Sequence, residues 1–141
     1  MIRWINMLSN PFNFNIFRSE SSSERQVIKN WLSTVCRHDP NEIIKLYAPD
    51  GVLLGTVAES MKVGRSEIKK YFDMFVKKKP CGKITSMNIQ SFGDVSVVDG
   101  TYTFKLTENG KTTKVPARYT FVLRQLNNQW VIASHHSSTQ P

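Results

Sequence analysis

The sequence predicts an α+β fold, in which helices come first and an antiparallel sheet follows. Apolar residues recur at helical spacing between residues 24 and 76, and apolar and polar residues alternate between residues 83 and 138. Short turn sequences separate the alternating segments. This order of elements is typical of proteins whose helices pack on one face of a single sheet.

Length and composition suit one domain around one core. The chain has 141 residues, of which 40% are hydrophobic and 21% are charged, as in most soluble globular proteins. We expect residues 21–141 to form this domain, and residues 1–20 to form a flexible arm or a segment that packs on a partner. The arm is too short and too polar to span a membrane, so no transmembrane segment is predicted.

The net charge and the cysteines narrow the choice of partner and compartment. The formal net charge is +8, and part of it lies in the lysines of residues 69–79. No aromatic-plus-basic recognition motif accompanies these lysines, so nucleic acid is not an expected partner. Cys36 and Cys81 have the spacing of neither a disulfide framework nor a metal site. We expect two unpaired thiols and a cytoplasmic protein, with secretion as the alternative.

Capping residues mark where the helices begin. Ser21 and Glu24 match a capping box, and the helix that follows carries an apolar face of Val27, Ile28, Trp31, Leu32 and Val35. A shorter helix begins at Asp39 and Pro40, and the sequence Pro49–Asp50–Gly51 predicts a turn after it. A short strand at residues 52–57 and a third helix that begins near Gly64 complete this half.

The second half predicts a four-stranded antiparallel meander. The strands are expected at residues 83–92, 94–106, 112–126 and 129–138, with turns at residues 93–94, 109–110 and 127–128. Tyr119, Phe121 and Leu123 point to one face, yet the other face also carries apolar residues. Because a sheet that is apolar on both sides needs two covers, we expect a second subunit on the face that the helices leave open.

Three segments, "LYAPDGVLLGT", "GRSEIKKYFDMF" and "ARYTFVLRQLNNQWVIASHHSSTQP", resemble the nuclear transport factor 2 superfamily. The resemblance covers residues 22–141 and is strongest to the branch that contains the calcium/calmodulin-dependent protein kinase II association domain and small SnoaL-like bacterial relatives. It implies a cone-shaped barrel, formed by a strongly curved antiparallel sheet packed on N-terminal helices. It also implies a pocket between sheet and helices, and assembly into dimers or larger rings.

Ketosteroid isomerase belongs to the same superfamily, but its reactive groups have no counterparts here. The resemblance would place its general base near Gly55, its oxyanion-hole tyrosine near Trp31, and its second acidic donor near Arg118 or Tyr119. None of these residues can take the corresponding role, so steroid isomerisation by that mechanism is not expected. The signatures of a protein kinase are also absent from the sequence.

The sequence "HHSS" near the C-terminus raises the question of a reactive cluster. Neighbouring residues on a strand point to opposite faces, so His135 and His136 cannot both bind one metal ion, and no metal site is expected. If each Asn-containing turn has two residues, Arg118 lies opposite Ser137, Thr120 opposite His135, Thr101 opposite Arg118 and Asp99 opposite Thr120. One face then gathers six candidate ligand-binding residues: Asp99, Thr101, Arg118, Thr120, His135 and Ser137. A bulge at Pro116 would shift the last two pairs.

Two functions fit this cluster. The first is a homo-oligomeric, association-domain-like module, without a cofactor, whose pocket takes a small anionic organic ligand. The resemblance implies a pocket arginine where this chain has Ser137, and we expect Arg118 to supply the guanidinium, although an Arg118–Asp99 bridge is the plainer reading. The alternative is an isomerase, cyclase or hydratase of the SnoaL-like kind, with His135 as candidate general base for a keto or carboxylate substrate.

Overall fold

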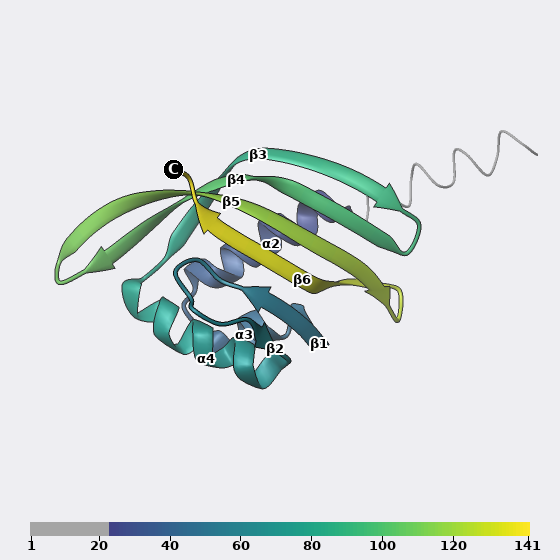
Figure 1. The fold of residues 1–141 in the computed structure, drawn as a ribbon, viewed down its shortest axis with the longest axis horizontal. Coiled ribbons are helices and arrows are strands. Elements are labelled where there is room, and N and C mark those ends of the chain that lie inside the picture. Colours follow the sequence, from purple (N-terminus) through teal and green to yellow (C-terminus); the bar gives the residue numbers. More distant parts are fainter. Residues whose placement is uncertain (1–22) are drawn as a thin grey trace, which may run out of the picture.

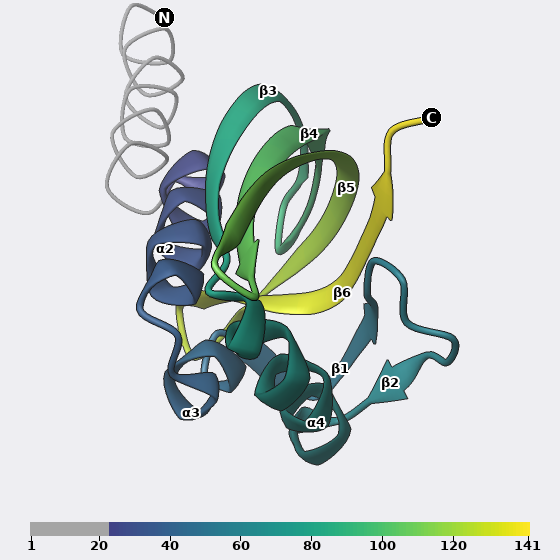
Figure 2. The same ribbon diagram turned by 90° about the vertical axis from the view of Figure 1, so that its left-hand side faces the viewer.

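The computed structural model describes residues 23–141, and Figure 1 shows their arrangement. The expected arm at residues 1–20 lies outside the described residues. A curved six-stranded sheet carries the helices on its concave side (Figures 1 and 2), and the strand order is β2-β1-β6-β5-β4-β3. Because β2 and β3 are the two edges of this order, the sheet curves without closing. The predicted α+β class, with helices first and a curved sheet after them, is confirmed.

In the described part of the chain, three helices precede most of the sheet: α2 (Glu24–Cys36), α3 (Pro40–Ile44) and α4 (Arg65–Phe75), with a short 3-10 turn η1 (Val76–Lys78) after α4. The N-cap of α2 is Ser23, whose hydroxyl accepts a hydrogen bond from the Gln26 amide. The helix therefore begins two residues later than the expected Ser21 cap. Asp39 caps α3 and Pro40 occupies its first turn, as predicted. Within residues 23–141, none of the helices combines the length and the apolar character needed to cross a membrane.

The strands are β1 (Tyr47–Leu54), β2 (Lys62–Val63), β3 (Cys81–Phe92), β4 (Val95–Glu108), β5 (Lys111–Leu126) and β6 (Gln129–Thr139). The predicted turn at Pro49–Asp50–Gly51 is wrong, because these residues lie inside β1, which pairs in parallel with β6 through an irregular register. At Gly51 a Cβ atom would lie only 3.1 Å from the carbonyl oxygen of Ile132, so the missing side chain permits this close pairing. Arg65 also holds the start of β1, because its Nε and Nη2 both donate to the Tyr47 carbonyl.

Strands β3 to β6 form the predicted antiparallel meander. The predicted two-residue turns join Glu108 to Lys111 and Leu126 to Gln129, and the pairs Thr101–Arg118 and Asp99–Thr120 follow as expected. The β5–β6 register slips once, however. Leu123 pairs with Ile132 but Val122 pairs with Ser134, so Ala133 is an extra residue in β6. This β-bulge reverses the faces of all residues that follow it in β6.

Aromatic side chains dominate the core between the sheet and the helices. Trp31 of α2 is buried at the centre of this core. The centroid of its ring lies within 6.5 Å of the ring centroids of Phe72, Tyr102, Phe104 and Phe121. Tyr119, Phe121 and Leu123 are buried on the concave face of β5, as predicted. A core of large rings is difficult to fill without gaps, and a cavity remains beside Trp31.

The expectation of two unpaired thiols is wrong. Cys36 at the end of α2 and Cys81 at the start of β3 form a disulfide across 45 residues of sequence. Spacing alone gave no sign of this pair, because it depends on α2 packing along β3 (Figure 1). The bond joins the last turn of a helix to the edge strand of the sheet.

Loss of the disulfide is expected to destabilise the fold. A closed loop of this length restricts the unfolded chain by about 4 kcal/mol in the chain-entropy model. The paired substitution Cys36→Ala/Cys81→Ala should therefore lower the free energy of unfolding, measured in urea, by about 4 kcal/mol. Dithiothreitol should lower the stability of the wild type by a similar amount and leave the double variant unchanged. Equal stability of wild type and double variant under oxidising conditions would contradict this expectation.

Candidate functional site

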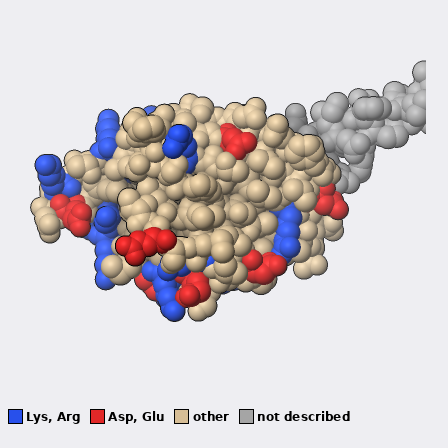
Figure 3. Space-filling model, in the orientation of Figure 1, with Lys and Arg blue, Asp and Glu red and all other residues tan. Residues whose placement is uncertain are grey.

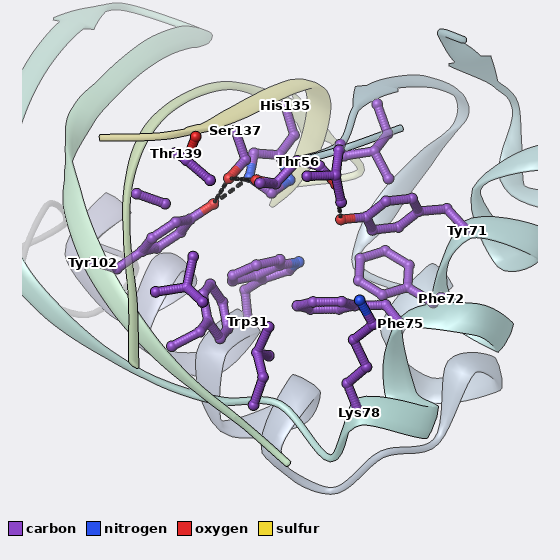
Figure 4. A pocket seen from close by; sticks show the side chains of 17 residues that line it. Trp31, Thr56, Tyr71, Phe72, Phe75, Lys78, Tyr102, His135, Ser137 and Thr139 are labelled. Carbon is purple, nitrogen blue, oxygen red and sulfur yellow. Dashed lines mark hydrogen bonds between the residues drawn. The ribbon is translucent and has the colours of Figure 1, made fainter. Parts of the chain in front are cut away.

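A cavity of about 290 Å³ lies between the concave face of the sheet and α4. Its walls come from α2, α4, the segment after β1, and strands β4 to β6. Most of the lining is apolar, and it includes six aromatic side chains: Trp31, Tyr71, Phe72, Phe75, Tyr102 and Phe104. Figure 4 shows the first five of them around the cavity. A cavity with these walls suits the apolar or aromatic body of a small organic molecule.

Two polar regions interrupt this apolar lining. Thr56, His135, Ser137 and Thr139 gather near β6, whereas Lys78 approaches from η1 and lies away from them (Figure 4). Lys78 is half-buried, and among the described residues that line the cavity it is the one with a cationic side chain. The cavity therefore has an uncharged polar end under β6 and a positive charge at the opposite side.

Hydrogen bonds join three of these residues, Thr56, His135 and Ser137, with two tyrosines in one continuous network. His135, only 2% exposed, contacts the Tyr47 hydroxyl through Nδ1 at 2.9 Å and the Tyr102 hydroxyl through Nε2 at 3.3 Å. The Tyr102 hydroxyl donates to the Ser137 Oγ at 2.6 Å, and the Thr56 Oγ1 donates to the same atom at 2.7 Å. Behind the cavity, the Trp31 indole donates to the Tyr47 hydroxyl at 3.1 Å.

Burial keeps this network uncharged. Removal from water lowers the pKa of His135 to about 3, with a smaller contribution from the neighbouring His136. Burial also raises the pKa of Tyr102 and Tyr47 far above the ordinary value for a phenol, and raises that of Tyr71 to about 12. At neutral pH the site therefore presents a neutral imidazole and protonated phenols.

The structure brings together only two of the six predicted site residues. His135 and Ser137 line the cavity, but Arg118, Thr120, Asp99 and Thr101 lie on the opposite, outer face of the sheet. The predicted pairs Arg118–Ser137 and Thr120–His135 are wrong, because the bulge at Ala133 pairs Arg118 with Ser138 and Thr120 with His136. The bulge therefore separates residues that a regular strand would have placed on one face.

On the outer face, the displaced residues bond to one another. The Thr120 Oγ1 donates to the Asp99 carboxylate at 2.5 Å, where an Arg118–Asp99 bridge was the plainer expectation. Thr101 shares hydrogen bonds with Thr85 at 2.6 Å and Ser86 at 2.8 Å. Arg118 is exposed. These four residues form part of a surface, and none of them contributes to the cavity.

Sequence reasoning missed Tyr47, Tyr102 and Thr56 as members of the site. Tyr102 was detectable, because it alternates with Thr101 on β4 and so lies on the face that Tyr119 also occupies. Tyr47 and Thr56 gave no comparable signal, since both depend on the pairing of β1 with the distant strand β6. Gly55, where the resemblance would place a catalytic acid, packs so closely on Tyr71 that a Cβ atom there would overlap its ring.

The neutral His135 makes stability depend on pH in a defined direction. Its pKa is about 3 in the folded protein against a reference value of 6.5, so between these values the unfolded chain binds a proton that the folded protein does not. Stability is then complete above pH 6.5 and falls as the pH decreases, by about 2 kcal/mol between pH 7 and pH 5. Urea unfolding at both pH values should show this loss in the wild type and in His136→Gln. In His135→Gln the loss should be smaller by that amount, and an unchanged pH dependence in this variant would contradict the assignment.

Comparison with known proteins agrees with the fold. The sequence matches the calcium/calmodulin dependent protein kinase II association domain family over residues 23–141. A solved structure of such an association domain from Xanthomonas campestris is 42% identical, covers 81% of this chain and 83% of that chain, and superposes with a TM-score of 0.78. No curated protein matches the sequence.

More distant structures share the fold alone. A nuclear transport factor 2-like protein with a cystatin-like fold from Novosphingobium aromaticivorans is 12% identical, with a TM-score of 0.75 over 92% of this chain and 86% of that chain. A ketosteroid isomerase-like protein from Erwinia carotovora is 21% identical, with a TM-score of 0.69 over 83% of this chain and 94% of that chain. The match over residues 23–141 and the 42% identity to the Xanthomonas protein show that the chain belongs to the calcium/calmodulin dependent protein kinase II association domain family.

Proposed function

We propose that the chain is a homo-oligomeric association module whose pocket binds a small organic ligand. The cavity beside Trp31, with an uncharged hydrogen-bonding end and apolar walls, is the observation that carries the proposal. Its volume of about 290 Å³ suits a molecule of one or two rings. The polar groups at this end are buried and uncharged, and such groups can hold and orient a molecule whose remainder contacts the apolar walls.

The charge that would attract an anionic ligand comes from a different residue than expected. Arg118 lies on the outer face, whereas Lys78 lines the cavity. We therefore propose Lys78 as the partner for a carboxylate, with the apolar body of the ligand against Trp31 and Phe75. The half-buried position of Lys78 leaves part of its charge screened by solvent, so its contribution is modest.

The enzyme alternative has weaker support. An isomerase, cyclase or hydratase of the SnoaL-like kind would need a group that exchanges protons near neutral pH. The burial that lowers the pKa of His135 to about 3 makes it a weak base, and no Asp or Glu of residues 23–141 lines the cavity. The same features suit binding, because a network of neutral donors and acceptors is already in place.

The outer sheet face supports self-association. Strands β4, β5 and β6 turn mostly uncharged side chains to this side, including the half-buried Val97, Thr120, Val122 and Ser138. Figure 3 shows a mostly uncharged surface over these strands, interrupted by a few Lys, Arg, Asp and Glu side chains. A second copy that packs on this area would cover the face that the helices leave open.

The disulfide indicates the kind of cellular compartment in which the protein is located. Disulfides persist in oxidising compartments and are rare in the cytoplasm. The Cys36–Cys81 bond therefore favours the secretion alternative over the cytoplasmic location that we expected from two free thiols. Alkylation of the protein inside its native cells tests the compartment. Two free thiols would be modified in a reducing compartment, whereas the intact disulfide would not be modified.

Substitution of Lys78 tests the ligand proposal. The dissociation constant of 2-naphthoate, measured by calorimetry, should rise about fivefold in Lys78→Met, because a partly exposed ion pair contributes about 1 kcal/mol. Arg118→Met removes an equal charge from the outer face and should leave binding unchanged. Weaker binding in Arg118→Met with no change in Lys78→Met would contradict the assignment, and no binding to the wild type would count against the pocket itself.

Substitution of Val122 tests the assembly proposal. A carboxylate at this half-buried position would be desolvated in an interface, so Val122→Asp should sediment as a smaller species than the wild type in analytical ultracentrifugation. Gln26→Glu adds the same charge on the exposed side of α2 and should sediment like the wild type. An unaltered sedimentation coefficient for Val122→Asp would place the interface elsewhere.

A further inference from the structure

The hydrogen bonds at the polar end of the cavity have a fixed direction, and the first residue of the network sets it. The indole nitrogen of Trp31 can only donate, and it donates to the Tyr47 hydroxyl at 3.1 Å. Both residues are buried, so neither has water as an alternative partner. The Tyr47 oxygen therefore accepts from Trp31 and turns its own hydrogen toward the other neighbour, the His135 Nδ1, at 2.9 Å.

This hydrogen bond determines the tautomer of His135. A neutral imidazole has one donor nitrogen and one acceptor nitrogen. Because Nδ1 accepts from Tyr47, Nε2 carries the hydrogen and points it at the Tyr102 hydroxyl, 3.3 Å away. The ring itself is held between aromatic neighbours: Phe121 is stacked on it, with ring centroids 3.9 Å apart, and Trp31 lies edge-on at 4.9 Å. The imidazole therefore has little freedom to turn over.

The same direction continues to the cavity wall. Tyr102 accepts from His135 and so donates to the Ser137 Oγ at 2.6 Å. The Thr56 Oγ1 donates to the same oxygen at 2.7 Å. Ser137 thus accepts two hydrogen bonds, which leaves its own hydroxyl hydrogen for a partner inside the cavity that both residues line (Figure 4).

We infer that this pocket selects ligands that place an acceptor oxygen, such as that of a ketone or ester, at Ser137, and that it rejects ligands that place an N–H donor there. The inference rests on the proposed ligand-binding function and defines the chemistry that the polar end recognises. A donor placed against Ser137 meets another donor, and a buried unmatched donor weakens binding by about tenfold to a hundredfold. Tyr47, which does not line the cavity, is the positioning residue for this preference.

The tautomer of His135 tests the inference without any ligand. In protein labelled with nitrogen-15 at histidine, two-dimensional NMR should show an unprotonated Nδ1 and a protonated Nε2 for His135 at pH 7. The missing signals in His135→Gln identify the residue. A protonated Nδ1 in the wild type would overturn the inference, because the hydrogen bonds that join Tyr47, His135, Tyr102 and Ser137 would then run in the opposite direction.

Three neutral bicyclic probes of similar size test the selectivity: 1-indanone offers an acceptor oxygen, indole offers an N–H donor, and indene offers neither. We expect the wild type to bind 1-indanone at least tenfold more tightly than indole. In Tyr47→Phe the His135 tautomer is no longer fixed, so the ratio should fall toward one. Tyr119→Phe is the matched control, since its buried hydroxyl bonds to the Ser86 carbonyl and takes no part in the network.

The outcomes separate this inference from the proposed function. If none of the three probes binds the wild type, the ligand pocket fails, and the inference fails with it. If all three bind with similar dissociation constants, the pocket stands and the inference is overturned. An equal loss of selectivity in Tyr47→Phe and Tyr119→Phe would also overturn it, because a general loosening of the core would then explain both variants.

Discussion

One extra residue in β6 determines which side chains face the interior of this protein. Ala133 has no partner on β5, and the residues after it are turned over relative to a regular strand. His135 and Ser137 consequently point into the concave side, and His136 and Ser138 point outward. Without the bulge, Ser137 would share the outer face with Arg118, and His136 and Ser138 would take the inward positions of His135 and Ser137.

Trp31 serves the packing of the core and the polarity of the site at once. Its ring fills the space among the aromatic side chains of α4, β4 and β5, and its nitrogen begins the hydrogen-bond network that ends at Ser137. Because the indole is rigid and buried, the network has one fixed end. A site built in this way combines apolar walls with one oriented polar contact, which is the arrangement that small-molecule pockets commonly have.

The sequence predicted those features that depend on neighbouring residues. The caps of α3, the start of α4 after Gly64 and the two-residue turns at Asn109–Gly110 and Asn127–Asn128 all have local chemical causes, so the register of β4 against β5 was correct. The bulge at Ala133 has no such signal, since alanine is ordinary in a regular strand. The Cys36–Cys81 bond and the β1–β6 pairing join residues far apart in sequence, and both emerge only from tertiary packing. Tyr47 and Thr56 could therefore not be assigned to the site before the fold was known.

The position of β6 has a consequence for the order in which this chain can fold. The last strand is an inner one, since it separates β1 from β5, and it pairs Tyr47 with Ile132 across most of the domain. During synthesis, β1 and β2 leave the ribosome long before the strand that connects them to the meander. The backbone N–H and C=O groups at the unpaired edge of β1 must not pair with other strands until β6 has been synthesised. Such long-range parallel pairing slows folding. In β1, Pro49 lacks a backbone N–H and Asp50 carries an exposed charge, and both features limit mispairing during that interval.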